Sequence, residues 1–71
     1  MPQPQPLRHS RGRLYWNGPL TMLQGPERIE DNWWQEAVSR DYYVAADRGG
    51  QQYWVFHDRL ARSWHIHGIF A

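Results

Sequence analysis

The chain has 71 residues, of which 41% are hydrophobic, and it contains no cysteine. This length suits one small domain with a single core, and without cysteine neither a disulfide framework nor a thiolate zinc site can form. Eight arginines against seven acidic residues give a formal charge of +1, which excludes strong electrostatic steering toward nucleic acid.

The first residues also bear on location. Residues 1–12 are rich in Pro, Gln and Arg and lack the apolar core of a secretory signal. No apolar stretch of the chain approaches the roughly 18 to 20 residues that span a bilayer, so we expect a cytoplasmic protein that makes no membrane contact. Because Pro2, Pro4 and Pro6 favour an extended polyproline conformation and cannot join the middle of a sheet, residues 1–12 are predicted to be a linker or disordered lead-in. The folded domain is then expected to cover residues 13–71.

Residues 13–23 resemble an imperfect hairpin. Asn17-Gly18, the dipeptide typical of a two-residue hairpin turn, separates the runs 13–16 and 20–23. Pro19 follows the turn directly and has no N–H to donate. We therefore expect an irregular or edge pairing between these two runs.

The next stretch carries breaking and capping signals. Gly25-Pro26 is expected to interrupt the chain, and residues 28–30 are predicted to form a short strand. Asp31-Asn32 is predicted to cap a single helical turn over residues 33–36. A longer helix is not expected, because a run typical of a strand begins at residue 40.

Residues 40–71 contain three consecutive strand signals. The runs 40–46, 52–57 and 63–70 are dense in Tyr, Trp, Phe, Val and Ile and are bounded by Gly, Asp or Ser. With short connections and almost no helix, these runs predict an all-β fold, a small antiparallel meander curled into a half-barrel. Residues 13–30 are expected to cover one of its sides.

A two-residue turn at Gly49-Gly50 predicts the register of the first hairpin. It places Val44 opposite Val55, and continuing through the next turn places Val55 opposite Ile66, Phe56 opposite His65 and Trp54 opposite His67. The core face predicted from this register consists of Tyr42, Val44, Ala46, Tyr53, Val55, Trp64, Ile66 and Phe70. The wettable face consists of Tyr43, Trp54, Phe56, His65 and His67.

The residues do not predict a catalytic or metal site. His65 and His67 have the spacing by which one strand can offer two metal ligands, but no carboxylate is placed to converge on them and His57 falls on the opposite face. We expect no bound metal or cofactor, and the two histidines to cover Trp54 and Phe56. No nucleophile motif and no phosphate-binding glycine loop followed by a helix occurs, so the chain is predicted not to be an enzyme.

Two binding functions are left open. Aromatic side chains fringed by Arg40, Arg48, Arg59 and Arg62 form the kind of surface on which single-stranded bases stack. Asp41, Asp47 and Asp58 lie on the same strand ends and offset much of the phosphate attraction. An aromatic patch on a nearly neutral domain is also typical of a protein interface, and this second interpretation is preferred. The candidate partner surface consists of Tyr43, Trp54, Phe56, His65, His67, Trp33 and Trp34.

Particular strings resemble a known family. They are Gly25-Pro-Glu-Arg-Ile-Glu30, Trp33-Trp34, Arg40-Asp-Tyr-Tyr-Val-Ala45, Tyr53-Trp-Val-Phe56 and Trp64-His-Ile-His-Gly-Ile-Phe70. In order and spacing they resemble the C-terminal domain of ImuB-type proteins, which are Y-family DNA polymerase homologues of the bacterial SOS mutagenesis cassette. The resemblance covers nearly the whole chain, including the Pro-Gln-rich lead-in. One departure is Ile66-His-Gly-Ile-Phe70, where the family often has Leu at the two Ile positions.

The resemblance implies a non-catalytic role in DNA damage tolerance and translesion synthesis. ImuB-like proteins are regarded as hubs that lack polymerase activity and bring together the sliding clamp, a DnaE-type error-prone polymerase and an ImuA-like partner. Their C-terminal region is associated with partner contacts. By resemblance, the expected partners of this chain are therefore the ImuA-like and DnaE-type proteins, with at most weak contact to DNA.

Overall fold

A computed structural model of the chain describes residues 3–32 and 37–70. All regular structure in these residues is β-strand, and no helix occurs in them. The strands are β1 (Gln5–Pro6), β2 (Arg8–Ser10), β3 (Arg13–Tyr15), β4 (Thr21–Asn32), β5 (Ala37–Ala46), β6 (Gln52–Asp58) and β7 (Ser63–Ile69). The predicted all-β class is therefore confirmed, while the helical turn expected over residues 33–36 lies outside the described residues.

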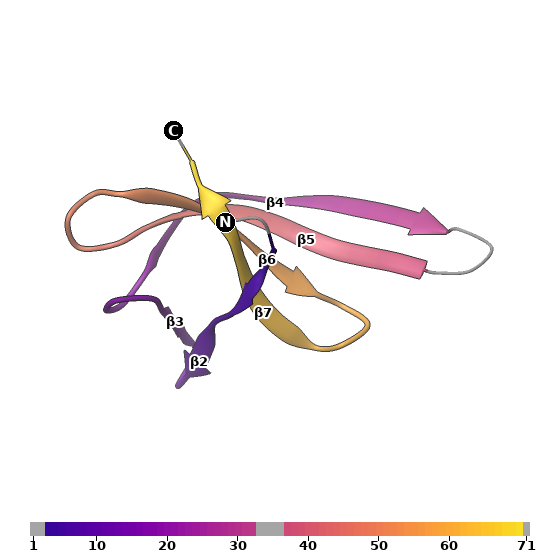
Figure 1. Cartoon of the computed structure of the whole chain (residues 1–71), viewed down its shortest axis with the longest axis horizontal. Coiled ribbons are helices and arrows are strands. Elements are labelled where there is room, and N and C mark those ends of the chain that lie inside the picture. The colour runs from indigo at the N-terminus through magenta and orange to yellow at the C-terminus, as the bar shows by residue number, and fades with distance from the viewer. Residues whose placement is uncertain (1–2, 33–36, 71) are drawn as a thin grey trace.

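Five strands form one antiparallel sheet in the order β1-β7-β6-β5-β4, and β2 and β3 form a separate two-stranded pair. The sheet does not close into a barrel, since β1 and β4 are its two edges. Figure 1 shows the β2–β3 pair beneath one face of the sheet, and β4 and β5 running side by side past the end of β6. The meander predicted over residues 40–70 is β5, β6 and β7.

The predicted register of the β5–β6 hairpin is wrong by one residue. Val44 pairs with Trp54, and Tyr43 pairs with Val55. The turn has three residues between its closing pair instead of two: the Asp47 N–H donates to the Gln51 carbonyl at 3.0 Å and the Gly50 N–H to the Asp47 carbonyl at 3.1 Å. Gly50 has a φ of 88°, as in a type I turn followed by a glycine bulge.

The register of the β6–β7 hairpin agrees with the prediction except at its far end. Val55 pairs with Ile66 and Phe56 with His65, as expected, but Trp54 pairs with Gly68 instead of His67. The register shifts between these pairs, because His67 is an extra residue in β7. This is a β-bulge, in which two residues of one strand face one residue of the other.

Strand β4 is longer than predicted. It runs through Gly25-Pro26, which was expected to break the chain, and also includes Asp31-Asn32, which was expected to cap a helix. Instead of a break, the strand has register shifts between Met22 and Gln24 and between Gln24 and Glu27. Strand pairing with β5 therefore continues on both sides of a local irregularity.

The pairing around Asn17-Gly18 is irregular, as predicted. Tyr15 forms only an isolated bridge with Pro19, and the Leu20 N–H donates to the Leu14 carbonyl at 2.9 Å. β3 pairs instead with β2, and residues 21–23 belong to β4. Residues 13–30 therefore do not act as one cover, because part of them is the edge of the sheet.

The lead-in contributes to the folded unit. Gln5 pairs with Ile66 and Pro6 with His65, and the Leu7 N–H donates to the Trp64 carbonyl at 2.9 Å. β1 is an edge strand, which is the place in a sheet that tolerates proline. The strands therefore begin at residue 5 and not at residue 13.

The core lies between one sheet face and the segment 7–20. This segment supplies Leu7, Leu14 and Leu20, and Trp16 packs against them. The sheet supplies Ala45, Tyr53, Val55 and Ile66, with Tyr43 and Trp64 at the margin. Three leucines spread over 14 residues thus provide the cover that a lone curved sheet lacks.

Candidate functional site

The other face of the sheet carries a cluster of aromatic side chains. We call it the open face, and it consists of Arg40, Tyr42 and Val44 of β5, Trp54 and Phe56 of β6, His65 and His67 of β7, and Phe70 after β7. In the described part of the chain, no strand packs on it. Alternation along the strands separates these residues from the core residues.

Phe56 lies at the centre of the open face and is only 1% exposed. The His65 ring stacks on it with centroids 5.1 Å apart and planes 19° apart. The Tyr42 and His67 rings lie 5.1 and 5.9 Å from it, and the Arg40 guanidinium lies 4.4 Å above its ring centroid. A cation over an aromatic ring is attracted by the negative π-face. Phe56 therefore supports the surface from below and is not itself available to a partner.

Hydrogen bonds hold the polar groups of this face in place. Arg40 Nη1 donates to the Tyr42 hydroxyl at 3.1 Å, and the same hydroxyl lies 3.4 Å from His67 Nδ1. Ser63 Oγ lies 2.8 Å from His65 Nε2. Side chains fixed in this way lose less conformational entropy when a ligand binds than free ones do.

Tyr42 and Trp54 are half-buried and lie side by side at the surface of the open face. Their rings meet edge to face at 6.3 Å, and Phe70 meets Trp54 edge to face at 4.9 Å. A hollow of about 140 Å³ adjoins this pair on the side of β4. A second hollow of about 310 Å³ lies toward His67. The face therefore offers apolar walls that a side chain or a base could contact.

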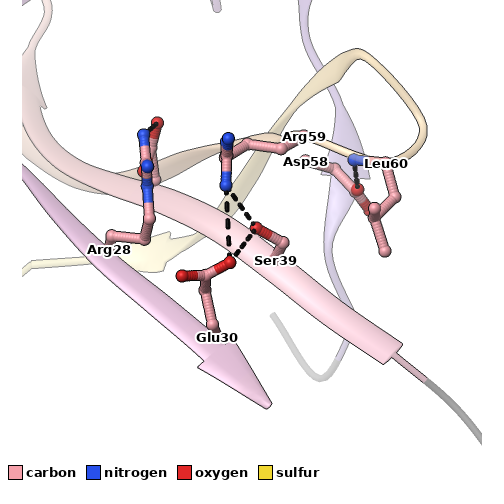
Figure 2. Close-up of polar contacts among 7 residues, drawn as sticks. Arg28, Glu30, Ser39, Asp58, Arg59 and Leu60 are labelled. Carbon is pink, nitrogen blue, oxygen red and sulfur yellow. Dashed lines mark hydrogen bonds and ion pairs between the residues drawn. The ribbon is translucent and has the colours of Figure 1, made fainter. Parts of the chain in front are cut away.

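The opposite side of the β4–β5 hairpin carries a polar cluster (Figure 2). Arg28 makes two bonds to Asp41, with Nε to Oδ1 at 2.7 Å and Nη2 to Oδ2 at 3.1 Å. The hydrogen bond from Arg28 lowers the pKa of the Asp41 carboxyl below its ordinary value, and the same contact raises the pKa of Arg28. A bidentate pair of this kind fixes the register of two strands.

Arg59 joins three elements of this cluster (Figure 2). Its Nη1 donates to Ser39 Oγ at 2.9 Å and lies 3.5 Å from Glu30 Oε2, and Ser39 Oγ donates to the same Glu30 oxygen at 3.3 Å. The preceding residue, Asp58, accepts the N–H groups of Leu60 and Ala61 at 3.0 Å each. The backbone bond from Ala61 is the main cause that lowers the pKa of Asp58. These bonds tie the β6–β7 turn to β4 and β5, so the cluster is structural.

The structure brings together four of the seven residues predicted for the partner surface. Trp54, Phe56, His65 and His67 share the open face. Tyr43 lies on the core side, where its ring is 5.5 Å from that of Trp64. Trp33 and Trp34 lie outside the described residues.

Sequence reasoning missed Tyr42, which it assigned to the core. The signal that could have placed it is Asp47, whose side chain accepts the N–H groups of Gly49 and Gln51 at 2.9 and 3.0 Å. Asp at the first position of a type I turn, followed by glycine in the left-handed region, is typical of a three-residue hairpin loop. That loop shifts the register by one residue and turns Tyr42 to the open face.

The described residues contain no group of three or more His, Asp or Glu side chains arranged to hold a metal ion. His57 pairs with Trp64 on the core side, away from His65. No helix that could cross a membrane occurs in the part of the chain that the structure describes.

Comparison with known proteins gives one clear relationship. No family model matches the chain, and no solved structure matches it significantly. Protein ImuB of Caulobacter vibrioides, from two strains, is 38% identical over 77 aligned positions, which cover 83% of this chain. The chain spans only 17% of the length of these curated relatives, and the matched part is a C-terminal portion. This chain is therefore a homologue of a C-terminal portion of ImuB.

Proposed function

We propose that this chain is a non-catalytic protein-interaction domain of an ImuB-like protein and that it helps to assemble an error-prone mutagenesis complex in DNA damage tolerance. The observation that carries the proposal is the open face. Tyr42, Trp54 and His67 remain accessible there, although segment 7–20 covers the opposite face of the same sheet. Exposed aromatic clusters of this kind are enriched at protein interfaces.

The homology supports the partner class. ImuB-type proteins are regarded as hubs that bring other proteins together. The proposed partners are therefore an ImuA-like protein and a DnaE-type error-prone polymerase. Within the described residues, Arg28 and Asp41 of the β4–β5 hairpin form an ion pair, and Glu30 of β4 pairs with Arg59 of the β6–β7 turn. The described residues show no nucleophile, base and orienting group in one cleft, and an interaction role needs none.

Capture of each proposed partner by the full chain tests this role. Trp54→Ser is expected to lower partner binding at least about tenfold, because an aromatic residue at the centre of an interface often contributes over 1 kcal/mol. Leu60→Ser is the control, since Leu60 is 61% exposed in the β6–β7 turn and does not belong to the open face. Equal binding by both variants and the unmodified chain would contradict the proposal.

Single-stranded nucleic-acid binding is the alternative, favoured by the partly accessible rings of Tyr42 and Trp54 on the same face as Arg40. Titration with a fluorescent single-stranded oligonucleotide at low and moderate salt separates the two functions. A nucleic-acid role predicts micromolar binding that falls steeply with salt and disappears in Trp54→Ala. We expect no such binding, because a formal charge of +1 releases few counterions.

A further inference from the structure

The hollow beside β4 lies at an irregularity in that strand. Gln24 pairs with Val44 and Glu27 with Tyr42, so two residues of β4, Gly25 and Pro26, stand opposite the single residue Tyr43 of β5. Gly25 has a φ of 115° and lies so close to β5 that an added Cβ would be 2.6 Å from the Tyr42 carbonyl oxygen. Gly25 therefore brings the β4 backbone close to β5 at one wall of the hollow.

The walls of this hollow have a distinct chemistry. It measures about 140 Å³ and is lined by Gln24, Gly25, Glu27, Tyr42, Val44 and Trp54. The lining residues include two aromatic, one aliphatic and one amide side chain, and Glu27 is the one lining residue that is charged at neutral pH. No cationic side chain lines it.

The Glu27 carboxylate differs from its neighbours in its bonding. Asp41 is bonded to Arg28, and Glu30 to Arg59 and Ser39. Among the described residues, Glu27 makes no ion pair and no side-chain hydrogen bond. Arg40, the cation of the open face, lies over Phe56 and bonds to the Tyr42 hydroxyl. The negative charge at the edge of the hollow is therefore not neutralised from within the described fold.

We propose that this hollow binds a basic side chain, an arginine or lysine, presented by a protein partner. The cation lies against the π-faces of Trp54 and Tyr42, and its charged end meets the Glu27 carboxylate. Aromatic walls attract cations through the ring quadrupole, and a carboxylate adds a charge-assisted hydrogen bond. The aliphatic stem of the same side chain packs on Val44.

The same features disfavour a nucleotide in this hollow. A phosphate would meet the uncompensated charge of Glu27 at close range, and repulsion between like charges lowers affinity. A peptide carboxylate is disfavoured for the same reason. The inference deepens the proposed function, on which it relies only for the source of the side chain.

A small probe tests the hollow without any partner. N-acetyl-arginine amide is added to the full chain labelled with nitrogen-15, and the Trp54 indole N–H resonance is followed. We expect a saturable shift with a millimolar dissociation constant, as for a ligand held by one ion pair and one cation–π contact. Glu27→Gln is expected to weaken binding at least about threefold, within the range measured for exposed ion pairs. Asp31→Asn, a matched change on the same strand and the same face but four residues away, is expected to leave the affinity unchanged.

Three results would overturn the inference. They are an affinity for the arginine probe that Glu27→Gln does not change, an equal or tighter affinity for N-acetyl-glutamate amide, and an equal or tighter affinity for thymidine monophosphate. If the arginine probe binds as expected while partner capture is unaffected by Trp54→Ser, the proposed function fails and the site stands. If Trp54→Ser lowers partner capture but Glu27→Gln does not change the affinity for the arginine probe, the interaction role stands. The proposal that the hollow binds a basic side chain is then wrong.

Discussion

Trp54 and Val55 are neighbours in β6 with side chains on opposite faces of the sheet. Val55 is fully buried in the core between the sheet and segment 7–20, whereas Trp54 is half-buried on the open face against Tyr42 and Phe70. The same substitution at the two positions therefore separates the needs of folding from those of binding.

Val55→Ser is expected to destabilise the domain by about 3 kcal/mol, because it removes buried methyl groups and buries a hydroxyl without a partner. A domain of this size is stable by roughly 4 to 10 kcal/mol, so the variant would keep only about 1 to 7 kcal/mol. Trp54→Ser is expected to cost about 1 kcal/mol, since the side chain is already partly in water. Urea unfolding followed by circular dichroism measures both. Equal losses would show that both faces are core.

The Arg28–Asp41 pair makes stability depend on pH. Its hydrogen bond lowers the pKa of Asp41 in the folded state, so the folded chain binds fewer protons than the unfolded chain near that pKa. The stabilisation is complete above the unfolded pKa of about 4 and is lost as pH falls through the folded value. We expect the free energy of unfolding to fall as the pH is lowered below about 4. Asp41→Asn should weaken this dependence, and Asp31→Asn should keep it.

At the scale of elements, hairpin chemistry decides how much the sequence could predict. The β-rich runs at 40–46, 52–57 and 63–70 correspond to β5, β6 and β7, because aromatic and β-branched residues bounded by turn residues are a strong local signal. The first register failed because Asp47 closes a loop of three residues. Since a shift of one residue exchanges the faces, Tyr42 and Tyr43 exchanged places. Trp54, Phe56 and His65 were correctly placed on one face. Trp54 and Phe56 are two residues apart in β6, and the predicted pairing of Phe56 with His65 in β7 was right.

β4 shows where local signals are insufficient. Gly25-Pro26 normally ends a strand, but pairing with β5 on both sides keeps β4 continuous across the bulge. Bulges, proline and the charges of Glu27 and Arg28 also protect this exposed edge from pairing with other chains. Long-range pairing of this kind is not encoded within the segment itself, so only the structure reveals it.

Gly25→Ala is expected to destabilise the chain by about 2 to 4 kcal/mol, because an L-residue is strained at a φ of 115° and its Cβ would meet the Tyr42 carbonyl at 2.6 Å. Gly68→Ala is the control, since a Cβ there meets no atom within 4 Å of the described structure. It should change stability by less than about 1 kcal/mol. Thermal unfolding of the two variants gives the comparison. A tolerated alanine at position 25 would show that the bulge adopts another conformation.

At the scale of the whole molecule, one face of a five-stranded open sheet is covered by segment 7–20, of which sequence reasoning assigned residues 7–12 to a linker. Composition predicted an extended lead-in, but it could not show that Leu7 reaches the core beside Leu14 and Leu20. Covering one face of the sheet and leaving the other open gives the aromatic residues two environments. Those on the covered face stabilise the fold, whereas Tyr42 and Trp54 on the open face stay partly accessible.

Leu7→Ser tests whether the lead-in belongs to the fold. Leu7 is 8% exposed within the core, although it lies in the segment expected to be a linker. Its loss should lower the free energy of unfolding by about 2 kcal/mol, the usual cost of removing a buried leucine at the margin of a core. Leu60→Ser, at 61% exposure, should change it by no more than about 0.5 kcal/mol. If the two leucines prove equivalent in urea unfolding, residues 5–10 are an appendage, and the three-leucine cover does not stabilise the sheet.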